Sequence, residues 1–252
     1  MERTARLKYG PEREARLFRR RQIALAGIFA VLWFGLQPFA AHAQGTARLA
    51  IGGESVFYTV PDGLASVQGI LPLNLKALDK EFFMDTKVFG IYVPKTYLDA
   101  RKQNPEALPE YYLQLCHDAF FTAHSFDNTA FYVLGVVVKS ILARQYAKAS
   151  FREKLAAVFS GAMGLTVHID ALTYLGSIEE TPSRFSVMGT GRALVTASGR
   201  EQAWPFAVVT TLHMVGGKVI TTIQIRRTPQ RKDVEAFKQE ALATVQSVWG
   251  VQ

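Results

Sequence analysis

The fold is decided by the stretch AWPFAVVTTLHMVGGKVITTIQIR, residues 203–226, in which two β-branched runs flank a pair of glycines. A two-residue turn of the primed type needs positive φ, so Gly216-Gly217 predicts a β-hairpin. Two more segments of strand composition precede this hairpin, each bounded by residues that favour turns. The four predicted strands are Leu165–Tyr174, Arg184–Ala197, Ala203–Val215 and Lys218–Arg226. Together they predict an antiparallel β-meander.

Helical periodicity occurs on both sides of this meander. Asn128–Lys148 carries apolar residues at three- and four-residue steps, which is typical of an amphipathic helix. A second helix is predicted from an N-cap at Ser150, with Glu153 three residues on, to about Met163. Asp233–Trp249 predicts the last helix. This order of elements predicts the α+β class, with helices packed on one twisted antiparallel sheet.

The first half of the body mixes strand and helix signals. Val56–Val60 is β-branched and aromatic, and Pro61-Asp62-Gly63 follows it with turn residues. The other predicted elements are a helix over Leu73–Phe83, a strand over Lys87–Val93, a helix over Thr96–Gln103 and a strand over Tyr111–Phe121. Because the chain from Gln44 to Gln252 shows no linker or repeat, we expect it to form one domain.

Residues 1–43 have the order of an export signal. Eight basic side chains precede the uncharged run Ile23–Leu36, and Ala41 and Ala43 occupy the small-residue positions of an A-x-A cleavage site. We therefore expect a signal peptide that is cleaved between Ala43 and Gln44, and a periplasmic or otherwise extracytoplasmic body.

A retained anchor is the alternative for the same segment. Ile23–Leu36 is shorter than the roughly 20 apolar residues that span a bilayer, but the uncharged window extends to Ala47. Arg20-Arg21-Gln22-Ile23 also loosely resembles a twin-arginine export signal. An anchor in the inner membrane would leave the N-terminus in the cytoplasm and the body outside, because positive charge stays inside.

The net charge of +8 is concentrated in the N-terminal segment. Residues 1–43 hold eight of the 29 basic and three of the 21 acidic side chains, so the body has 21 basic and 18 acidic ones. A nucleic-acid groove needs a stripe of one sign with interleaved aromatics, and the body intersperses its charges. We expect no nucleic-acid partner, and membrane contact through the N-terminal segment alone.

The common signatures of catalysis and cofactor binding are missing from the sequence. It contains no GxGxxG, GxxxxGK[ST], HExxH or GxSxG pattern and no EF-hand loop. Cys116 is the single cysteine, which excludes an internal disulfide and a cysteine-rich zinc site. In an oxidising compartment a single thiol is tolerated when buried, so we expect Cys116 to be buried and inert. No cofactor is expected.

Two segments resemble the PsbP and DcrB-like superfamily of small α/β sandwich proteins. Val56–Gly63 is similar to the family's opening strand and Pro-x-Gly turn, and Gly217–Ile225 followed by a helix containing Phe237 is similar to its closing pattern. Leu64 stands where the family often has tryptophan, and the predicted helices over residues 128–163 are a further departure. The resemblance implies a non-catalytic exported accessory or binding domain, without catalytic residues to carry over.

Cys116-His117-Asp118 contains the residue types of a nucleophilic site. Adjacent side chains on a strand point to opposite faces, so this spacing argues against a working pair. A metal cluster is the other interpretation. It would need His117, Asp118 and His124 to meet His168 and Asp170, which share one face of a predicted strand. Zinc suits such imidazole and carboxylate ligands.

Two further sets of residues are candidates for a site or a surface. Glu179-Glu180 could supply carboxylates for acid–base work, but in a predicted turn beside Thr181-Pro182 we expect them to be solvated. Adjacent aromatic pairs could form a partner surface if one ring of each pair points outward. These pairs are Phe82-Phe83, Tyr111-Tyr112 and Phe120-Phe121.

The sequence as a whole predicts an exported accessory or binding protein of the cell envelope, without catalytic activity. Its expected partner is a protein or a small apolar ligand. One alternative is an envelope enzyme or metal-binding protein that uses His117, Asp118 or His168. Another is a membrane-anchored component of an assembly.

Overall fold

The computed structural model describes residues 46–67, 86–118, 121, 123–163 and 165–250. The chain divides into two compact units, Met1–His42 and Ala43–Gln252. The first unit lies outside the described residues, and so do the expected cleavage site at Ala43 and Gln44 and the predicted helix over residues 73–83. All the described residues belong to the second unit.

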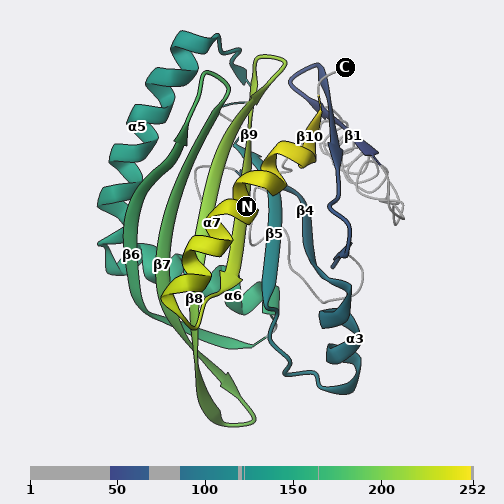
Figure 1. Cartoon of the computed structure of the whole chain (residues 1–252), viewed down its shortest axis with the longest axis vertical. Coiled ribbons are helices and arrows are strands. Elements are labelled where there is room, and N and C mark those ends of the chain that lie inside the picture. The colour runs from purple at the N-terminus through teal and green to yellow at the C-terminus, as the bar shows by residue number, and fades with distance from the viewer. Residues whose placement is uncertain (1–45, 68–85, 119–120, 122, 164, 251–252) are drawn as a thin grey trace, which may run out of the picture. The chain divides into compact units, whose positions relative to one another are not determined.

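Strands dominate the described part of the chain, and four helices accompany them (Figure 1). The strands are β1 (Thr46–Ile51), β2 (Glu54–Thr59), β3 (Leu64–Ser66), β4 (Thr86–Pro94), β5 (Tyr111–Asp118), β6 (Thr166–Glu180), β7 (Arg184–Ala197), β8 (Arg200–Val215), β9 (Lys218–Arg227) and β10 (Trp249–Gly250). The helices are α3 (Lys95–Gln103), α5 (Asn128–Tyr146), α6 (Ala149–Met163) and α7 (Arg231–Val248).

The strands form one large and one small antiparallel sheet. The large sheet has seven strands in the order β3-β4-β5-β9-β8-β7-β6, and the small one has the order β1-β2-β10. Strands β6 to β9 pair with their neighbours in sequence, all antiparallel. This confirms the α+β class and the C-terminal meander that the sequence predicts.

Tight turns with positive φ join β7 to β8 and β8 to β9. Gly216 and Gly217 have φ values of 57° and 74°, as the predicted hairpin between β8 and β9 requires. Ser198 and Gly199 do the same between β7 and β8, with φ values of 48° and 71°. Ser198 is the one described non-glycine residue with positive φ, so this turn has no sequence signal as clear as a glycine pair.

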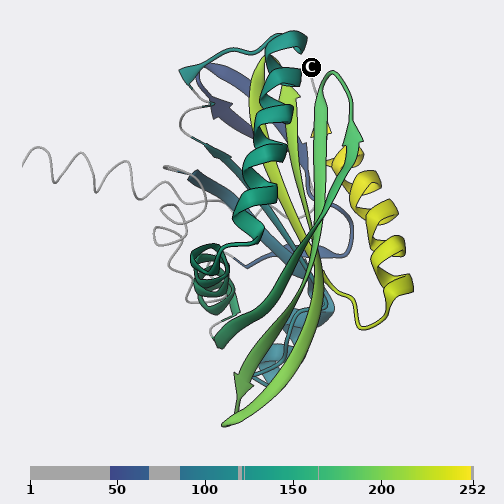
Figure 2. The ribbon, with the colours of Figure 1, turned by 90° about the vertical axis from the view of Figure 1, so that its left-hand side faces the viewer.

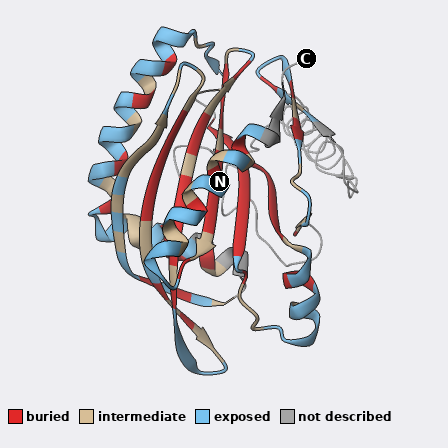
Figure 3. Cartoon of the chain, viewed as in Figure 1, coloured by how far each residue is buried: buried red, intermediate tan, exposed pale blue. Residues whose placement is uncertain are grey.

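The large sheet is covered on both faces. In Figure 2, α5 and α6 lie on one side of it and α7 on the other. The core under α5 and α6 contains Phe131 and Phe159 with Tyr112 and Cys116 of β5. The core under α7 contains Phe237, Ala241 and Val245 with Leu113 and Leu115 of the same strand. Alternate residues of β5 therefore serve two cores, which is why every residue of that strand is buried (Figure 3).

A buried glutamine fastens α7 to the sheet. Gln224 of β9 donates through Nε2 to the carbonyl oxygen of Ala241 at 3.0 Å and accepts from the hydroxyl of Tyr111 at 2.7 Å. Its side chain is fully buried, so both bonds replace water that burial removes. These bonds tie the middle of α7 to β9 and β5.

Three local predictions differ from the structure. The strand predicted to end at Tyr174 continues as β6 to Glu180, and the strand predicted to reach Phe121 ends at Asp118, with residues 121 and 123 helical. Helix α6 begins at Ala149, and the carbonyl of Lys148 accepts from the backbone of Phe151 at 3.2 Å, so Ser150 lies in the first turn rather than at the cap.

None of the helices among the described residues is long and apolar enough to cross a membrane.

Candidate functional site

A row of polar side chains crosses the α7 face of the large sheet. Glu179, Ser186, Thr211 and Thr222 lie directly opposite one another on β6, β7, β8 and β9. Directly opposed residues of antiparallel strands point to the same face. Ser186, Thr211 and Thr222 are fully buried there. We call these four residues the polar row.

The position of Glu179 depends on an irregularity in β6. The pairing of β6 with β7 shifts register between Ser177 and Glu179. A bulge of this kind re-aims the side chains that follow it. As a result Ile178 packs in the α7-side core while Glu179, the next residue, also reaches that face. Glu180 instead pairs with Lys139 of α5, so the two glutamates serve opposite sides of the sheet.

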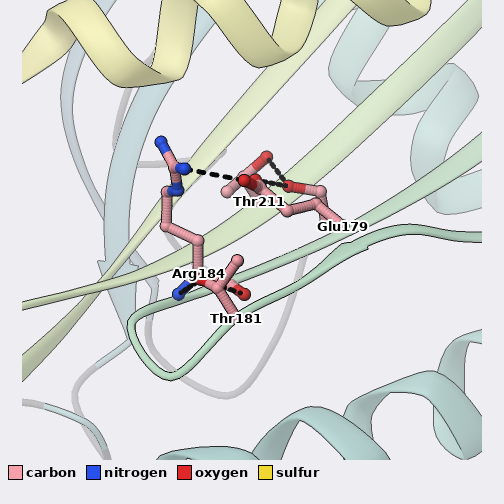
Figure 4. Close-up of polar contacts among 5 residues, drawn as sticks. Glu179, Thr181, Arg184 and Thr211 are labelled. Carbon is pink, nitrogen blue, oxygen red and sulfur yellow. Dashed lines mark hydrogen bonds and ion pairs between the residues drawn. The ribbon is translucent and has the colours of Figure 1, made fainter.

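Glu179 forms an ion pair inside the protein. Nη2 of Arg184 lies 2.7 Å from Oε1 of Glu179, and the two side chains are only 20% and 14% exposed. Figure 4 shows the guanidinium and the carboxylate turned toward each other, with the hydroxyls beside them. Ser186 donates to Oε2 of Glu179 at 3.4 Å and shares a hydrogen bond of 2.9 Å with Thr211. The arginine therefore balances the charge of the carboxylate, and the serine hydroxyl replaces water as a hydrogen-bond donor to it.

The same arginine closes the turn between β6 and β7. The backbone nitrogen of Arg184 donates to Oγ1 of Thr181 at 2.9 Å, and the backbone nitrogen of Thr181 donates to the carbonyl of Arg184 at 2.8 Å. Glu179-Glu180 thus ends a strand and does not lie in a turn, contrary to the prediction. Its first member is also mostly buried, because the turn brings Arg184 over it.

An imidazole next to this cluster is held neutral. His213 of β8 lies directly opposite Arg184 of β7. Burial, and then the positive charge of Arg184, lower the pKa of His213 to about 4. The side chain is therefore uncharged at neutral pH.

This arrangement stabilises strand register more readily than it performs chemistry. A serine nucleophile needs a base that is free to take its proton, and here the carboxylate near Ser186 is engaged by Arg184. A pocket of about 560 Å³ does occur in the protein, but its lining contains no member of the polar row. We interpret Glu179, Ser186 and Thr211 of the row, with Arg184, as an internal clamp across β6, β7 and β8.

The structure separates the residues proposed for nucleophilic chemistry. Cys116 is buried on the α5 side of the sheet, as expected for an inert thiol. His117 points to the other face, where its ring stacks on Phe89 with 4.7 Å between centroids. Its Nδ1 lies 3.3 Å from the carbonyl oxygen of Asp118. Adjacent positions on β5 thus diverge, as the sequence argument required.

The residues proposed as metal ligands are also apart. His117 and Asp118 end β5, whereas His168 and Asp170 are exposed on β6. Three strands lie between β5 and β6, which at the usual spacing is a separation of about 19 Å. Asp170 accepts from Nε of Arg192 at 2.7 Å. Among the described residues, no group of three or more His, Cys, Asp or Glu could hold a metal ion.

His124, the remaining residue proposed as a metal ligand, and the described members of the aromatic pairs do not form a site. His124 is exposed, and its carbonyl oxygen accepts from Nζ of Lys218 at 3.1 Å. Tyr111 and Tyr112 are both buried, one in each core. Phe121 packs edge-on against Phe126. Residues 82, 83 and 120 lie outside the described residues.

A different apolar surface is exposed, on the outer side of α5. Its buried side carries Phe131, Leu142 and Tyr146. The outer side carries five large apolar side chains that are about half exposed, and we call them the α5 face. They are Tyr132 (59%), Val133 (55%), Val136 (49%), Val137 (47%) and Ile141 (43%). A soluble surface rarely gathers so many aliphatic side chains on one helix unless something binds there.

Few charges interrupt the α5 face. Helix α5 contains two charged residues in 19, Lys139 and Arg144. Nζ of Lys139 lies 2.9 Å from Oε1 of Glu180, which raises the pKa of the lysine. A hydrogen bond from Ser177, and then the contact with Lys139, lower the pKa of Glu180. This pair attaches α5 to the end of β6 and leaves the aliphatic side chains facing outward.

The 560 Å³ pocket is a second candidate site, at the start of α7. Phe206, Val234 and Leu175 are among the residues that line it, and Leu175 is 52% exposed. Arg231 and Glu235, of opposite charge, also line it. We call it the α7 pocket.

Comparison with known proteins adds little to this geometry. No family model matches the chain, and no curated protein matches it. Among solved structures, the chain is similar to the Ran-binding protein Mog1p of Saccharomyces cerevisiae, with a TM-score of 0.34 and 10% identity. The match covers 82% of this chain and 95% of that chain. A likeness this low carries no inference about function.

Proposed function

We propose that the protein is an exported, non-catalytic accessory protein of the cell envelope that acts by binding a protein partner through the α5 face. The observation that carries the proposal is the exposure of five large apolar side chains on one helix. Burying half-exposed aliphatic side chains is worth roughly 25 cal/mol per Å², so a partner here gains stability.

Two observations support the non-catalytic part of the proposal. Glu179, Ser186 and Thr211 are engaged in internal hydrogen bonds and an ion pair with Arg184, and His117 and His168 lie on distant strands. The resemblance of Val56–Gly63 and Gly217–Ile225 to the PsbP and DcrB-like superfamily points the same way, and membership of that superfamily is part of the proposal. Export is proposed from the sequence of residues 1–43.

Native mass spectrometry of the full-length gene product, purified from its host's envelope, tests the binding surface. We expect the wild-type protein to carry additional mass, Val137→Glu to lose it, and Leu175→Glu to keep it. Both substitutions place a carboxylate on an aliphatic position that is about half exposed, so the second controls for general effects of charge. Wild-type protein at the mass of a single chain contradicts the proposal.

A second candidate function is capture of a small molecule with an apolar part in the α7 pocket. The open, partly apolar lining with Leu175 at its wall favours it. The same experiment separates the two, because Leu175→Glu would then remove a small added mass while Val137→Glu would keep it.

The position of the mature N-terminus tests export. Cleavage predicts Gln44 as the first residue in the periplasmic fraction. A chain that begins at Met1 in the membrane fraction supports the anchored alternative, and a body in the cytoplasmic fraction contradicts both.

A further inference from the structure

We infer that the occupant of the α5 face is the α5 face of a second copy of the chain, with the two helices antiparallel and crossing at Val137. This inference rests on the proposed function, because it names the partner of the surface described there.

The spacing of the aliphatic side chains is symmetric about Val137. Val133 precedes it by four residues and Ile141 follows it by four, so all three lie on one stripe of the helix. An antiparallel pair centred on Val137 places Val133 of each copy against Ile141 of the other. A two-fold interface of this kind needs a self-complementary patch, and here each aliphatic side chain meets another.

The charges at the two ends of α5 are complementary in the same arrangement. Asp127 lies ten residues before Val137, and Lys148 lies eleven residues after it. Antiparallel pairing therefore brings Asp127 of each copy near Lys148 of the other, with Arg144 one turn away. Asp127 uses Oδ1 to accept from the backbone nitrogen of Ala130 at 2.7 Å, which leaves its second oxygen for such a contact. Parallel pairing would place like charges together.

The chemistry of the face favours a protein over a bilayer. Helices that lie in a membrane interface carry Trp, Phe or Leu on the apolar side and several Lys or Arg on the other. The α5 face is mainly valine and isoleucine, and α5 has two basic residues, one paired with Glu180. Valine and isoleucine are stiff at χ1, so they lose little freedom when packed against a partner helix.

Cysteine substitution in the full-length chain tests the pairing and its direction. We expect Val137→Cys to form a disulfide-linked dimer under mild oxidation, because position 137 of one copy meets position 137 of the other at the crossing point. We also expect a mixture of the Val133→Cys and Ile141→Cys proteins to give about tenfold more mixed dimer than either self-linked dimer, since disulfides need Cα atoms within about 7 Å. The native Cys116 is buried and stays out of the reaction.

Leu175→Cys, at an aliphatic position on β6 that is similarly exposed, serves as the control and should form no disulfide-linked dimer. Self-linked dimers of Val133→Cys and of Ile141→Cys, without the mixed dimer, indicate parallel pairing and overturn the inference. Absence of any linked dimer also overturns it. If in that case Val137→Glu still releases a different protein, or still abolishes binding to phosphatidylglycerol vesicles, that protein or the bilayer is the occupant. The proposed function survives if the occupant is a different protein, and it fails if the occupant is the bilayer.

Discussion

Glu179 and Arg184 are charged residues that the structure holds mostly away from water, at the end of the β6–β7 hairpin. Removing one partner of a desolvated ion pair leaves the other charge uncompensated, and that cost exceeds the net worth of the pair. The Lys139–Glu180 pair, one residue along the same strand, is 46% and 38% exposed. The two pairs allow a matched comparison between a buried and an exposed contact.

We predict that Glu179→Ala and Arg184→Ala each lower the free energy of unfolding by about 2 kcal/mol, as for one partner of a mostly buried pair. The double variant should lose less than the sum, because it leaves no uncompensated charge. Urea denaturation of the two single variants and the double variant measures this coupling. Lys139→Ala and Glu180→Ala should show a much smaller effect, and equal coupling in both pairs would refute the clamp.

His213 predicts a dependence of stability on pH. Its folded pKa of about 4 lies below the ordinary value of 6.5, so the unfolded chain binds the proton more readily. The folded protein therefore has the full free energy of unfolding above about pH 6.5, and part of it is lost as the pH falls toward 4. Between pH 7.5 and pH 5 the loss amounts to about 2 kcal/mol, at 1.36 kcal/mol per pKa unit.

The variant His213→Gln isolates this contribution. The difference in unfolding free energy between pH 7.5 and pH 5 should be smaller for the variant than for the wild type. Identical pH profiles for the two proteins would show that His213 does not titrate in this range.

Two buried glutamines on neighbouring strands allow a prediction at the scale of one helix. Gln224 binds Ala241 of α7 and Tyr111, whereas Gln114 faces the other core and accepts from Tyr112 at 2.6 Å. We predict that Gln224→Leu speeds amide hydrogen exchange in the middle of α7, because the bond to its backbone is lost. Gln114→Leu should leave exchange in α7 unchanged. Equal exchange of α7 in both variants would mean that packing of Phe237 and Val245 alone fastens the helix.

Elements with a local signal were predictable from the sequence. The glycine pair at 216 and 217 set one hairpin, and the apolar periodicity of residues 128–148 marked α5 to within two residues. Where the local sequence signals were weak, the observed ends of strands and helices differ from the predicted ends. β6 runs six residues past its predicted end because Gly176, at φ 117°, sits within a register irregularity and does not end the strand.

The candidate site was harder to predict than the fold. Ser186 and Thr211 come together only through the register of β7 with β8, and hydroxyl residues are common in strands. Arg184 could not be singled out because its partner, Glu179, reaches it through a bulge that leaves no mark in the sequence. The alternation of Arg184, Ser186 and Met188 with Phe185 and Val187 was the one available signal.

The α5 face was visible in the sequence but could not be recognised there. Apolar residues lie on the outer side of α5 as well as on the side that packs on the sheet, so the three- and four-residue steps did not reveal that Val133, Val137 and Ile141 would stay exposed. The contact of Gly135 with Phe185 fixes the orientation, because a Cβ at Gly135 would lie 3.0 Å from that ring. Close approach at this glycine turns Val133, Val137 and Ile141 outward.

At the scale of the whole molecule, both faces of the large sheet are covered, and helix α5 exposes large apolar side chains on its outer side. Each face of the large sheet already has its own core of buried apolar residues, and the outer side of α5 belongs to neither core. The proposed function therefore depends on this outer side being a binding surface.

Site-specific photo-crosslinking in living cells tests that surface most directly. A photoreactive amino acid is placed at Val137 of the full-length chain, and in a separate strain at Leu175 as the matched exposed position. We predict one discrete adduct in the envelope fraction from position 137, at twice the mass of the chain if the partner is a second copy, and none from position 175. Absence of an adduct at 137, or the same adducts from both positions, would contradict the binding surface.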